Sequence, residues 1–532
     1  MSSNRLSVRR IALYLFLFFT AALSIWLMVN LISGSSTRIK IDESTTYITD
    51  PSQRDPSKVD YVAYANRKLS LGVTPQNNAV ATLIKFSPQL GPDSFDSKYL
   101  KLLDVSAIGL KKFKTVPADK ILEKIIDETE AKLIKAGNWT EENREATRNR
   151  LEALMYFPWD VQKFPSLANW LESHEAILNE VREAAAQSHY YSPLVCDETS
   201  GLISALLPVC QQTREFSRGL ALRAMHFLHE GNVEQCQADL LAIRKLAAHL
   251  SKGPFYVQKI ISFSNLGVAR KAEWAMARNE NVSAEQLEKY LSQIRGLTVP
   301  EDCLTETLLY ERMMILDAVS KVAHFGAEGL SQVMAMGGRS KDNSTGRFFT
   351  NVAISMIDWN VVLQEINIYF DNVQDVMKEP DLATQTVLAK RIEEELTERA
   401  EESHDAGNIA WAMLAGRKAK GKLAANYAVA MFMPAISTIC NSRNDAIVQE
   451  KIIRCQIGIE IYRKQQGKLP NRLEDVSALQ PQDWVDLHTG KAFASPTELF
   501  PALYSLGPNQ KDDQGRTRYS EPAGDDIPLH FE

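Results

Sequence analysis

The chain has 532 residues, of which 45% are apolar and 24% are charged, and its formal net charge is −6 at pH 7. These fractions are typical of folded globular proteins and exclude an intrinsically disordered chain. The charges are spread along the chain, without the basic patch that marks a nucleic-acid surface, so we expect no nucleic-acid partner.

A long apolar run lies near the N-terminus, at residues 11–33, and it contains no charged side chain. A helix rises about 1.5 Å per residue, so this run matches a hydrocarbon core about 30 Å thick. A helix also satisfies its own backbone hydrogen bonds in lipid. We therefore predict one transmembrane helix, through which the lipid bilayer anchors the protein. A cleaved signal peptide is the alternative, although its apolar region would be shorter, about 7–15 residues.

Basic residues flank the predicted span unequally. Arg5, Arg9 and Arg10 precede it, whereas Arg38 and Lys40 follow it next to two acidic residues. Cytoplasmic flanks carry the excess of Lys and Arg, so this bias favours a cytoplasmic N-terminus. We expect a single-pass protein of the bacterial inner membrane whose body lies on the periplasmic side.

The body is predicted to be helical and to follow a polar linker at 34–60 that contains two prolines. Its clearest unit spans 214–252, where apolar residues recur every three or four positions on both sides of a Gly-Asn break. This pattern predicts two helices packed as an αα-hairpin. Ser283 and Gln286 form a capping box at the start of another helix. Because no fixed repeat period is present, both a closed bundle and an open solenoid fit the pattern.

Further helices are predicted at 303–325, 351–376 and 384–440, and a surface loop rich in Gly, Ser and Asn is predicted at 334–347. The last helical stretch includes an apolar run at 423–440. We interpret this run as a buried helix rather than a second membrane span, because it is short and contains Asn426 and Pro434.

Six cysteines are present, and none belongs to a C-x-x-C pair, which argues against a zinc ribbon or a thioredoxin motif. A periplasmic body permits disulfide bonds, and Cys196–Cys210 is the first pair to consider. Buried free thiols are an equally good interpretation.

Several short motifs resemble catalytic signatures but lack essential parts. Gly416 begins a G-x-x-x-x-G-K pattern, but leucine follows the lysine in place of Ser or Thr, and a predicted helix precedes the pattern. His226 and His229 lie one helical turn apart beside Glu230, without an evident third ligand. An enzyme site assembled from these three residues and Asp317 is therefore a weaker hypothesis.

A helix, a Gly-x-x-Pro turn and short strands joined by Asp/Gly loops are predicted near the C-terminus. The segments are YRKQQGKLPNRLEDV at 462–476, DLHTGKAF at 486–493, LYSLGPNQKDDQG at 503–515 and GDDIPLHF at 524–531. They resemble the C-terminal domain of the major (G-type) pseudopilins of type II secretion. The resemblance implies a small α+β module at 441–532. The whole chain also resembles large single-anchor bacterial envelope proteins that end in this module.

In the pseudopilin family, the acidic loop near the C-terminus holds calcium, which prefers about six to eight oxygen ligands. The resemblance therefore implies a calcium site at the matching positions, which are Asn509, Asp512, Asp513, Asp525 and Asp526. Asn509 stands where the family often has Asp, so one charge is lost. An ordinary acidic turn without metal is the alternative, and no other cofactor is expected.

Together these patterns predict a mainly α protein with one N-terminal transmembrane helix, a helical-hairpin body and a small α+β module. The predicted segments are 1–10 (cytoplasmic), 11–33 (transmembrane), 34–60 (linker), 61–440 (helical body) and 441–532 (pseudopilin-like module). We expect a non-enzymatic envelope protein whose body binds a protein partner. A component of a type II secretion-like apparatus is the main alternative. Against it, the membrane helix of pseudopilins continues directly into their C-terminal domain, whereas here the body separates the two.

Overall fold

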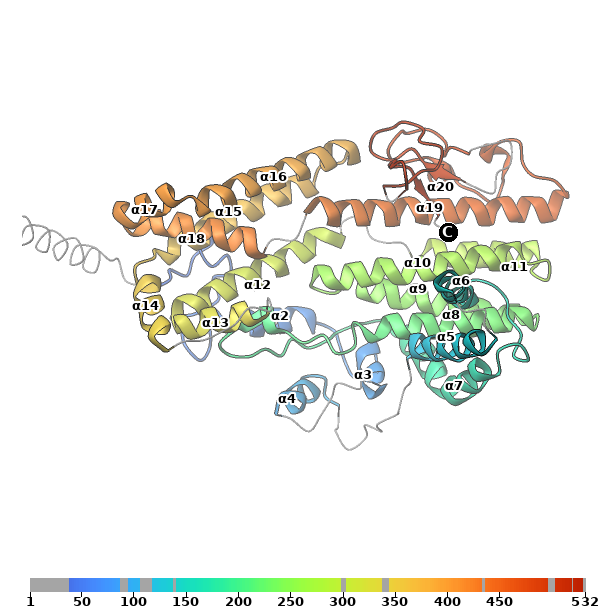
Figure 1. The fold of residues 1–532 in the computed structure, drawn as a ribbon, viewed down its shortest axis with the longest axis horizontal. Coiled ribbons are helices and arrows are strands. Elements are labelled where there is room, and N and C mark those ends of the chain that lie inside the picture. Colours follow the sequence, from blue (N-terminus) through green and yellow to red (C-terminus); the bar gives the residue numbers. More distant parts are fainter. Residues whose placement is uncertain are drawn as a thin grey trace, which may run out of the picture.

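The computed structural model describes residues 38–86, 94–105, 117–136, 140–297, 303–336, 344–432, 436–495, 503–518 and 520–529. The predicted cytoplasmic N-terminus and membrane span therefore lie outside the described residues. The described chain is mainly helical, as predicted (Figure 1).

The helices of the first half are α2 (Tyr61–Leu69), α3 (Ala79–Leu83), α4 (Ser94–Leu102), α5 (Ala118–Lys135), α6 (Glu141–Glu152), α7 (Pro165–Ala185), α8 (Gln212–His229), α9 (Val233–Leu250), α10 (Tyr256–Arg278) and α11 (Ala284–Arg295). Those that follow are α12 (Cys303–Phe325), α13 (Ala327–Met336), α14 (Ser344–Ser355), α15 (Trp359–Met377), α16 (Leu382–His404), α17 (Ala406–Ala415), α18 (Arg417–Phe432), α19 (Ile436–Gln466) and α20 (Pro481–Trp484). Short 3-10 turns are η1 (Ile84–Phe86), η3 (Ala153–Met155), η4 (Gly201–Ser204) and η5 (Leu473–Asp475), and β1 (Tyr504–Ser505) pairs antiparallel with β2 (Ile527–Pro528).

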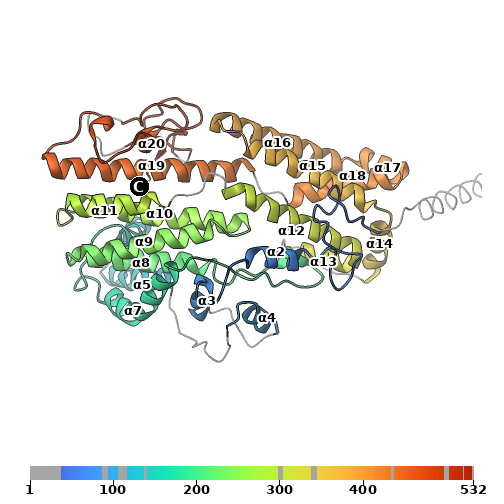
Figure 2. The same ribbon diagram turned by 180° about the vertical axis from the view of Figure 1, so that it is seen from behind.

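The helices form two halves that lie end to end along the long axis (Figure 1, Figure 2). One half contains α5 to α11 and the other contains α12 to α18, and each has its own large hydrophobic cluster. α10 contributes to both clusters, with Phe263 in one and Ala269 in the other. The α8–α9 pair confirms the hairpin predicted at 214–252, and Asn232 caps its second helix by accepting from Gln235 N.

α19 is 31 residues long, and its start packs on α16 of the α12–α18 half, whereas the rest runs along α10 and α11 of the other half. Ile436 and Ile439 near its start belong to the cluster of the α12–α18 half, whereas Ile452 and Ile457 belong to the cluster of the α5–α11 half. The C-terminal segment, by which we mean all residues after Gln466, then folds back onto α19 through α20 and β2.

A buried ion network fixes α19 against α9 and α10. Arg244 of α9 is 0% exposed, and its guanidinium donates to Glu273 Oε2 at 2.6 Å and to Glu450 Oε2 at 2.7 Å. Arg270 Nη1 lies 3.3 Å from Glu450 Oε1, and Tyr290 OH donates to Glu273 Oε1 at 2.7 Å. Although burial opposes ionisation, the two arginines hold the pKa of Glu450 below its usual value. Both carboxylates are thus paired, as a charge inside a core requires.

The segment expected to be a linker is packed against the body over its described part, residues 38–60. Lys40 N donates to Asn360 Oδ1 at 2.8 Å, and Asn367 Nδ2 donates to Thr45 O at 2.8 Å. Thr45 is 0% exposed. Polar side chains of this segment and of α15 form hydrogen bonds with the backbone of residues 38–60. The polar composition of the segment therefore does not mean that it is free in solvent.

Two other boundaries differ from the sequence prediction. Helix covers both ends of the loop predicted at 334–347, because α13 continues to Met336 and α14 begins at Ser344, while 337–343 lie outside the described residues. The single helix predicted at 351–376 is interrupted before α15. There Asp358 Oδ1 accepts from Asn360 N at 3.2 Å, which starts a new helix by N-capping.

The Cys196–Cys210 pair considered as a disulfide is not bonded, since both thiols are free, and Cys210 is 2% exposed. Burial raises the pKa of each of these two thiols to about 12. The other cysteines with described side chains, Cys236, Cys440 and Cys455, are also free and buried. The alternative of buried free thiols therefore fits this part of the chain better than the disulfide.

Within the described ranges, the stretch Arg417–Gln466 is long and apolar enough to cross a membrane by length and composition alone. It includes the apolar run at 423–440. α18 nevertheless packs against both α15 and α16, and α19 packs against α10 and α11. Core helices of soluble proteins pass the same compositional test. The packing of α18 and α19 therefore favours the interpretation that they belong to the body rather than to a membrane span.

Candidate functional site

The first candidate site lies in the C-terminal segment, where the β1–β2 pair brings two acidic loops together. Tyr504 pairs with Pro528 and Ser505 pairs with Ile527. The loop that follows β1 therefore lies beside the residues that precede β2. Asp486, which is 1% exposed, supports β1 by accepting from Ser505 Oγ at 2.8 Å.

The two loops approach closely because a glycine stands at the contact. Gly507 has a φ of +62°, and a Cβ at this position would lie 2.0 Å from Asp525 O. Gln510 and Gln514 in the same loop also adopt positive φ, at 58° and 64°. A larger residue in place of Gly507 would push the acidic loops apart.

Three carboxylates converge where these loops meet. One oxygen from each of Asp513, Asp525 and Asp526 lies within 4.8 Å of the others. Asp513 Oδ2 accepts from Asp525 N at 3.1 Å, and Asp526 Oδ2 accepts from Gly515 N at 2.7 Å. Two further oxygens, Asp525 Oδ1 and Asp526 Oδ1, are buried and have no hydrogen-bond partner in the described structure.

The electrostatics of this cluster are unfavourable in the absence of a cation. Asp526 is 2% exposed, and burial, together with the charges of Asp513 and Asp512, raises its pKa to about 6. Burial and the charge of Asp513 also raise the pKa of Asp525. The nearest compensating charge is Arg516, whose Nη2 lies 3.8 Å from Asp513 Oδ1. A bound cation would remove this repulsion and give both orphaned oxygens a partner.

Of the five predicted ligands, the carboxylates of Asp513, Asp525 and Asp526 converge, whereas Asn509 and Asp512 make other hydrogen bonds. Asn509 joins the loops, because its N donates to Asp525 Oδ2 at 2.9 Å and its Nδ2 donates to Asp513 Oδ2 at 3.1 Å. Asp512 Oδ1 accepts from Tyr504 OH at 2.9 Å and lies outside the group of three carboxylates. The prediction of Asp512 as a ligand therefore does not match this arrangement.

The chemistry of the donor set fits calcium. Calcium takes about six to eight oxygens in irregular geometry, and three carboxylates supply up to six. A soft transition metal would instead require His or Cys ligands. Among the described residues, this trio is the only group of three or more such side chains whose ligand atoms converge.

The residues of the dispersed-site hypothesis are engaged separately. His226 Nε2 lies 3.6 Å from Glu230 Oε1, and His229 is exposed. Asp317 accepts from Leu202 N at 2.8 Å, and burial raises the pKa of its carboxyl to about 6. Asp317 thus holds η4 on α12, which is a structural role.

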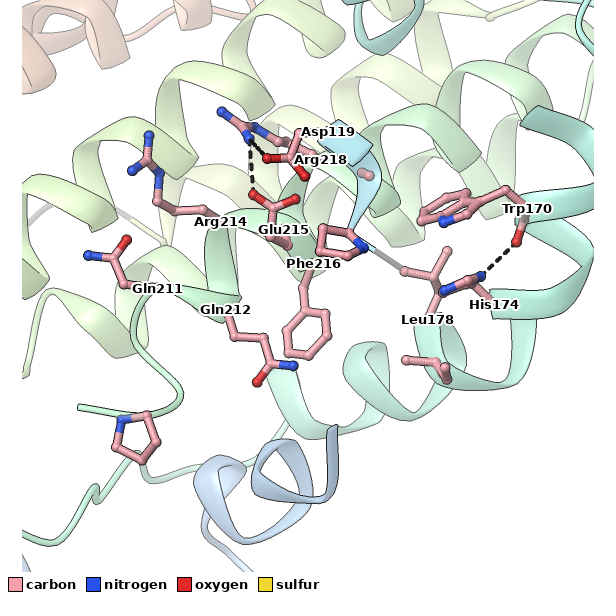
Figure 3. Close-up of a pocket in the computed structure, with 14 residues that line it drawn as sticks. Asp119, Trp170, His174, Leu178, Gln211, Gln212, Arg214, Glu215, Phe216 and Arg218 are labelled. Carbon is pink, nitrogen blue, oxygen red and sulfur yellow. Dashed lines mark hydrogen bonds and ion pairs between the residues drawn. The ribbon is translucent and has the colours of Figure 1, made fainter. Parts of the chain in front are cut away.

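A second candidate is a cavity of about 530 Å³ between α5, α7 and α8 (Figure 3). Trp170, Leu178 and Phe216 contribute apolar surface to it. His174 stacks on Trp170 with ring centroids 4.5 Å apart, and its Nδ1 lies 2.9 Å from Trp170 O. Burial lowers the pKa of His174 and so disfavours the charged form of this ring.

The polar side of the cavity holds a carboxyl pair that shares one arginine. Arg218 Nη1 lies 3.0 Å from Glu215 Oε1 and 3.7 Å from Asp119 Oδ2. Figure 3 shows the two carboxyl groups facing each other. Burial, with the nearby charge of Asp119, raises the pKa of Glu215. The cavity therefore combines an apolar wall with a charged one.

Sequence patterns did not reveal this cavity. Asp119 lies in the first turn of α5 and Glu215 in the first turn of α8, and acids in first turns are ordinary helix-start residues. Their juxtaposition depends on how α5 packs on α8, for which the sequence gives no local signal.

Comparison with known proteins adds no assignment to either site. No protein-family model, curated protein or solved structure matches the chain. Function is therefore inferred from the side chains of these sites and from the sequence pattern.

Proposed function

We propose that the protein is a membrane-tethered, non-enzymatic envelope protein, whose helical body binds a protein partner and whose C-terminal segment is stabilised by calcium. The convergence of Asp513, Asp525 and Asp526, with two buried oxygens that lack donors, is the observation that supports the calcium site most directly. The uncharged run at 11–33 supports the tether.

A cation at the acidic trio would act as a structural clamp. It would join the loop after β1 to the residues before β2, and so close the C-terminal segment. This segment is already attached to α19, because Gln449 Nε2 donates to Pro528 O at 3.2 Å and Arg518 Nη2 donates to Asp445 Oδ2 at 2.8 Å. Closing the loops would therefore also fix the face that the segment presents above α19.

Calcium titration of the full-length protein in detergent micelles tests the proposal. We expect one saturable site per chain and a higher melting temperature. A free calcium concentration of about 100 times Kd would raise the free energy of unfolding by about 2.7 kcal/mol. Asp526→Asn should abolish saturable binding, because it replaces the most buried carboxylate of the trio.

Asp375→Asn is the matched control, since the Asp375 side chain is 77% exposed on α15 and lies outside the trio. It should leave calcium binding unchanged. A wild-type protein that folds but takes up no calcium would refute the calcium site. Equal binding by wild type and Asp526→Asn would place the ion elsewhere and equally refute it.

The alternative function, a component of a type II secretion-like apparatus, is supported by the resemblance of residues 462–476, 486–493, 503–515 and 524–531 to pseudopilins. Crosslinking of the full-length protein in native membranes, followed by identification of co-purified proteins, separates the two. Enrichment of secretion components would favour the apparatus. Recovery of other envelope proteins would favour the partner-binding role proposed above.

A further inference from the structure

α17 exposes an apolar surface on the outside of the body. Its sequence is AGNIAWAMLA, and the side chains of Trp411, Met413 and Leu414 are 69%, 46% and 67% exposed. Ala412 faces inward at 5% exposure, and α17 packs on α16 and α18. A cluster of large exposed apolar side chains on one short helix marks an interaction surface, unlike single apolar residues scattered over a protein surface.

This surface lies at the end of the body where the chain enters from its N-terminus. Asn360 Nδ2 lies 3.5 Å from Arg38 O, at the first described residue. Asp358, which lies two positions before Asn360, donates its N–H to Arg417 O at 3.3 Å. Arg417 directly follows Gly416, which ends α17 with a φ of +98°. Arg38, the start of α15 and the end of α17 are therefore joined by consecutive contacts.

The predicted span ends only five residues before Arg38. A chain extends at most about 3.6 Å per residue, so the end of the span lies within about 18 Å of Arg38. The end of the body that carries α17 is therefore held close to the membrane surface. Figure 1 and Figure 2 both place α17 at one extreme of the long axis, far from α11 and the C-terminal segment.

The chemistry of this end matches a lipid headgroup region. Tryptophan is enriched at membrane interfaces, because it has an apolar ring and one polar N–H. Lys418 and Lys422 follow on one face of α18, and the Lys422 side chain is 70% exposed. Acidic residues also precede α17, including Glu402 and Asp405, of which Asp405 caps the helix by accepting from Asn408 N at 3.0 Å. Insertion of the apolar side chains, rather than net charge, is therefore the main source of affinity.

We propose that α17 lies in the interface of the same bilayer that holds the anchor, with Trp411, Met413 and Leu414 inserted among the lipid headgroups. This inference rests on the proposed membrane tether. It makes the body a second membrane contact, so that the protein is held in one orientation rather than swinging freely on a single helix.

Tryptophan quenching in vesicles tests the two contacts separately. The full-length protein is reconstituted into phosphatidylcholine and phosphatidylglycerol vesicles with or without acyl-chain bromination. The emission that brominated lipid removes is then measured for wild type, Trp411→Phe and Trp26→Phe. Trp26 lies within the predicted span, so the difference in quenched emission between wild type and Trp26→Phe reports the anchor. The corresponding difference between wild type and Trp411→Phe reports α17. We expect brominated lipid to quench both components.

A control places a reporter in the other half of the body. Phe157 is 60% exposed and lies just after η3, which packs on α8. Phe157→Trp in the Trp411→Phe background should add emission that aqueous iodide quenches and brominated lipid does not.

If Trp26 is quenched by brominated lipid and Trp411 is not, the inference on α17 is wrong and the anchor stands. If Trp411 is shielded from iodide but not quenched by lipid, a protein surface such as a second copy covers α17, and the inference is again wrong. Quenching of Trp411 without quenching of Trp26 would support α17 and refute the anchor.

Discussion

Removing Arg244 should destabilise the protein more than any surface substitution. Its guanidinium is fully buried and bonds to two carboxylates, Glu273 and Glu450, on two different helices. Arg244→Met keeps most of the volume but leaves both acids less compensated. Breaking a buried ion pair on one side costs about 3–5 kcal/mol, because the remaining charge stays in the core. We therefore expect the free energy of unfolding to fall by about that amount.

Urea denaturation followed by far-ultraviolet circular dichroism measures this change. Lys378→Met is the control, since its ion pair with Asp375 joins side chains that are 60% and 77% exposed. Exposed pairs contribute about 0–1 kcal/mol, so the control should remain close to wild type. A loss of less than about 1 kcal/mol in Arg244→Met would contradict the reasoning, because it would mean that water or rearrangement satisfies the two carboxylates.

The pH dependence of Arg244→Met provides an independent check. Without the guanidinium, Glu450 loses one of the charges that hold its pKa down, so the folded-state pKa of Glu450 is higher in the variant than in wild type. The folded variant then binds a proton more tightly than folded wild type does, so the variant loses stability relative to wild type as pH rises. The stability difference from wild type should therefore narrow as pH is lowered from 8 toward about 5. A stability difference that does not vary with pH would contradict the rise in the pKa of Glu450.

Other measurements address a buried acid, a loop glycine and a core amide. Burial raises the pKa of Glu311 from 4.5 to about 7, so stability should fall as pH rises across this window, and Glu311→Gln should flatten that slope in urea titrations. Gly507→Ala forces a Cβ against Asp525 O and should weaken calcium binding in calorimetric titration, whereas unchanged affinity would contradict the geometry of the loops. Asn66 Oδ1 accepts from Leu194 N and its Nδ2 donates to Leu194 O, each at 2.8 Å, so Asn66→Ala should cost about 1–3 kcal/mol in urea denaturation. An unchanged free energy of unfolding in Asn66→Ala would show that water replaces the amide.

The features that sequence predicted correctly are local ones. The α8–α9 hairpin follows from apolar periodicity over neighbouring turns, and the capping box was readable from Ser283 and Gln286 alone. In the structure, Gln286 N donates to Ser283 Oγ at 3.2 Å and Ser283 N donates to Gln286 Oε1 at 2.9 Å. Both signals depend on residues within one or two helical turns, which is why they could be read without the fold.

The features that sequence missed depend on distant pairs. Arg244 and Glu450 are separated by 206 positions, and nothing local distinguishes them from surface charges. Polar composition alone suggested a free linker at 34–60, because the amides of α15 that bind it lie more than three hundred positions away, with Asn367 and Ser44 separated by 323. At the acidic trio, resemblance supplied the residues, but it did not show that Asp512 would accept from Tyr504 OH and lie outside the group.

The unbroken length of α19 has a mechanical consequence. At about 1.5 Å per residue, its 31 residues form a rod about 46 Å long. One end is embedded in the half that contains Arg38 and α17, and the other bears the C-terminal segment. A continuous hydrogen-bonded helix resists bending, so a force applied to the C-terminal segment is transmitted along α19 instead of being absorbed by a flexible joint. α19 therefore acts as a strut between the α12–α18 half, on which its start packs, and the C-terminal segment.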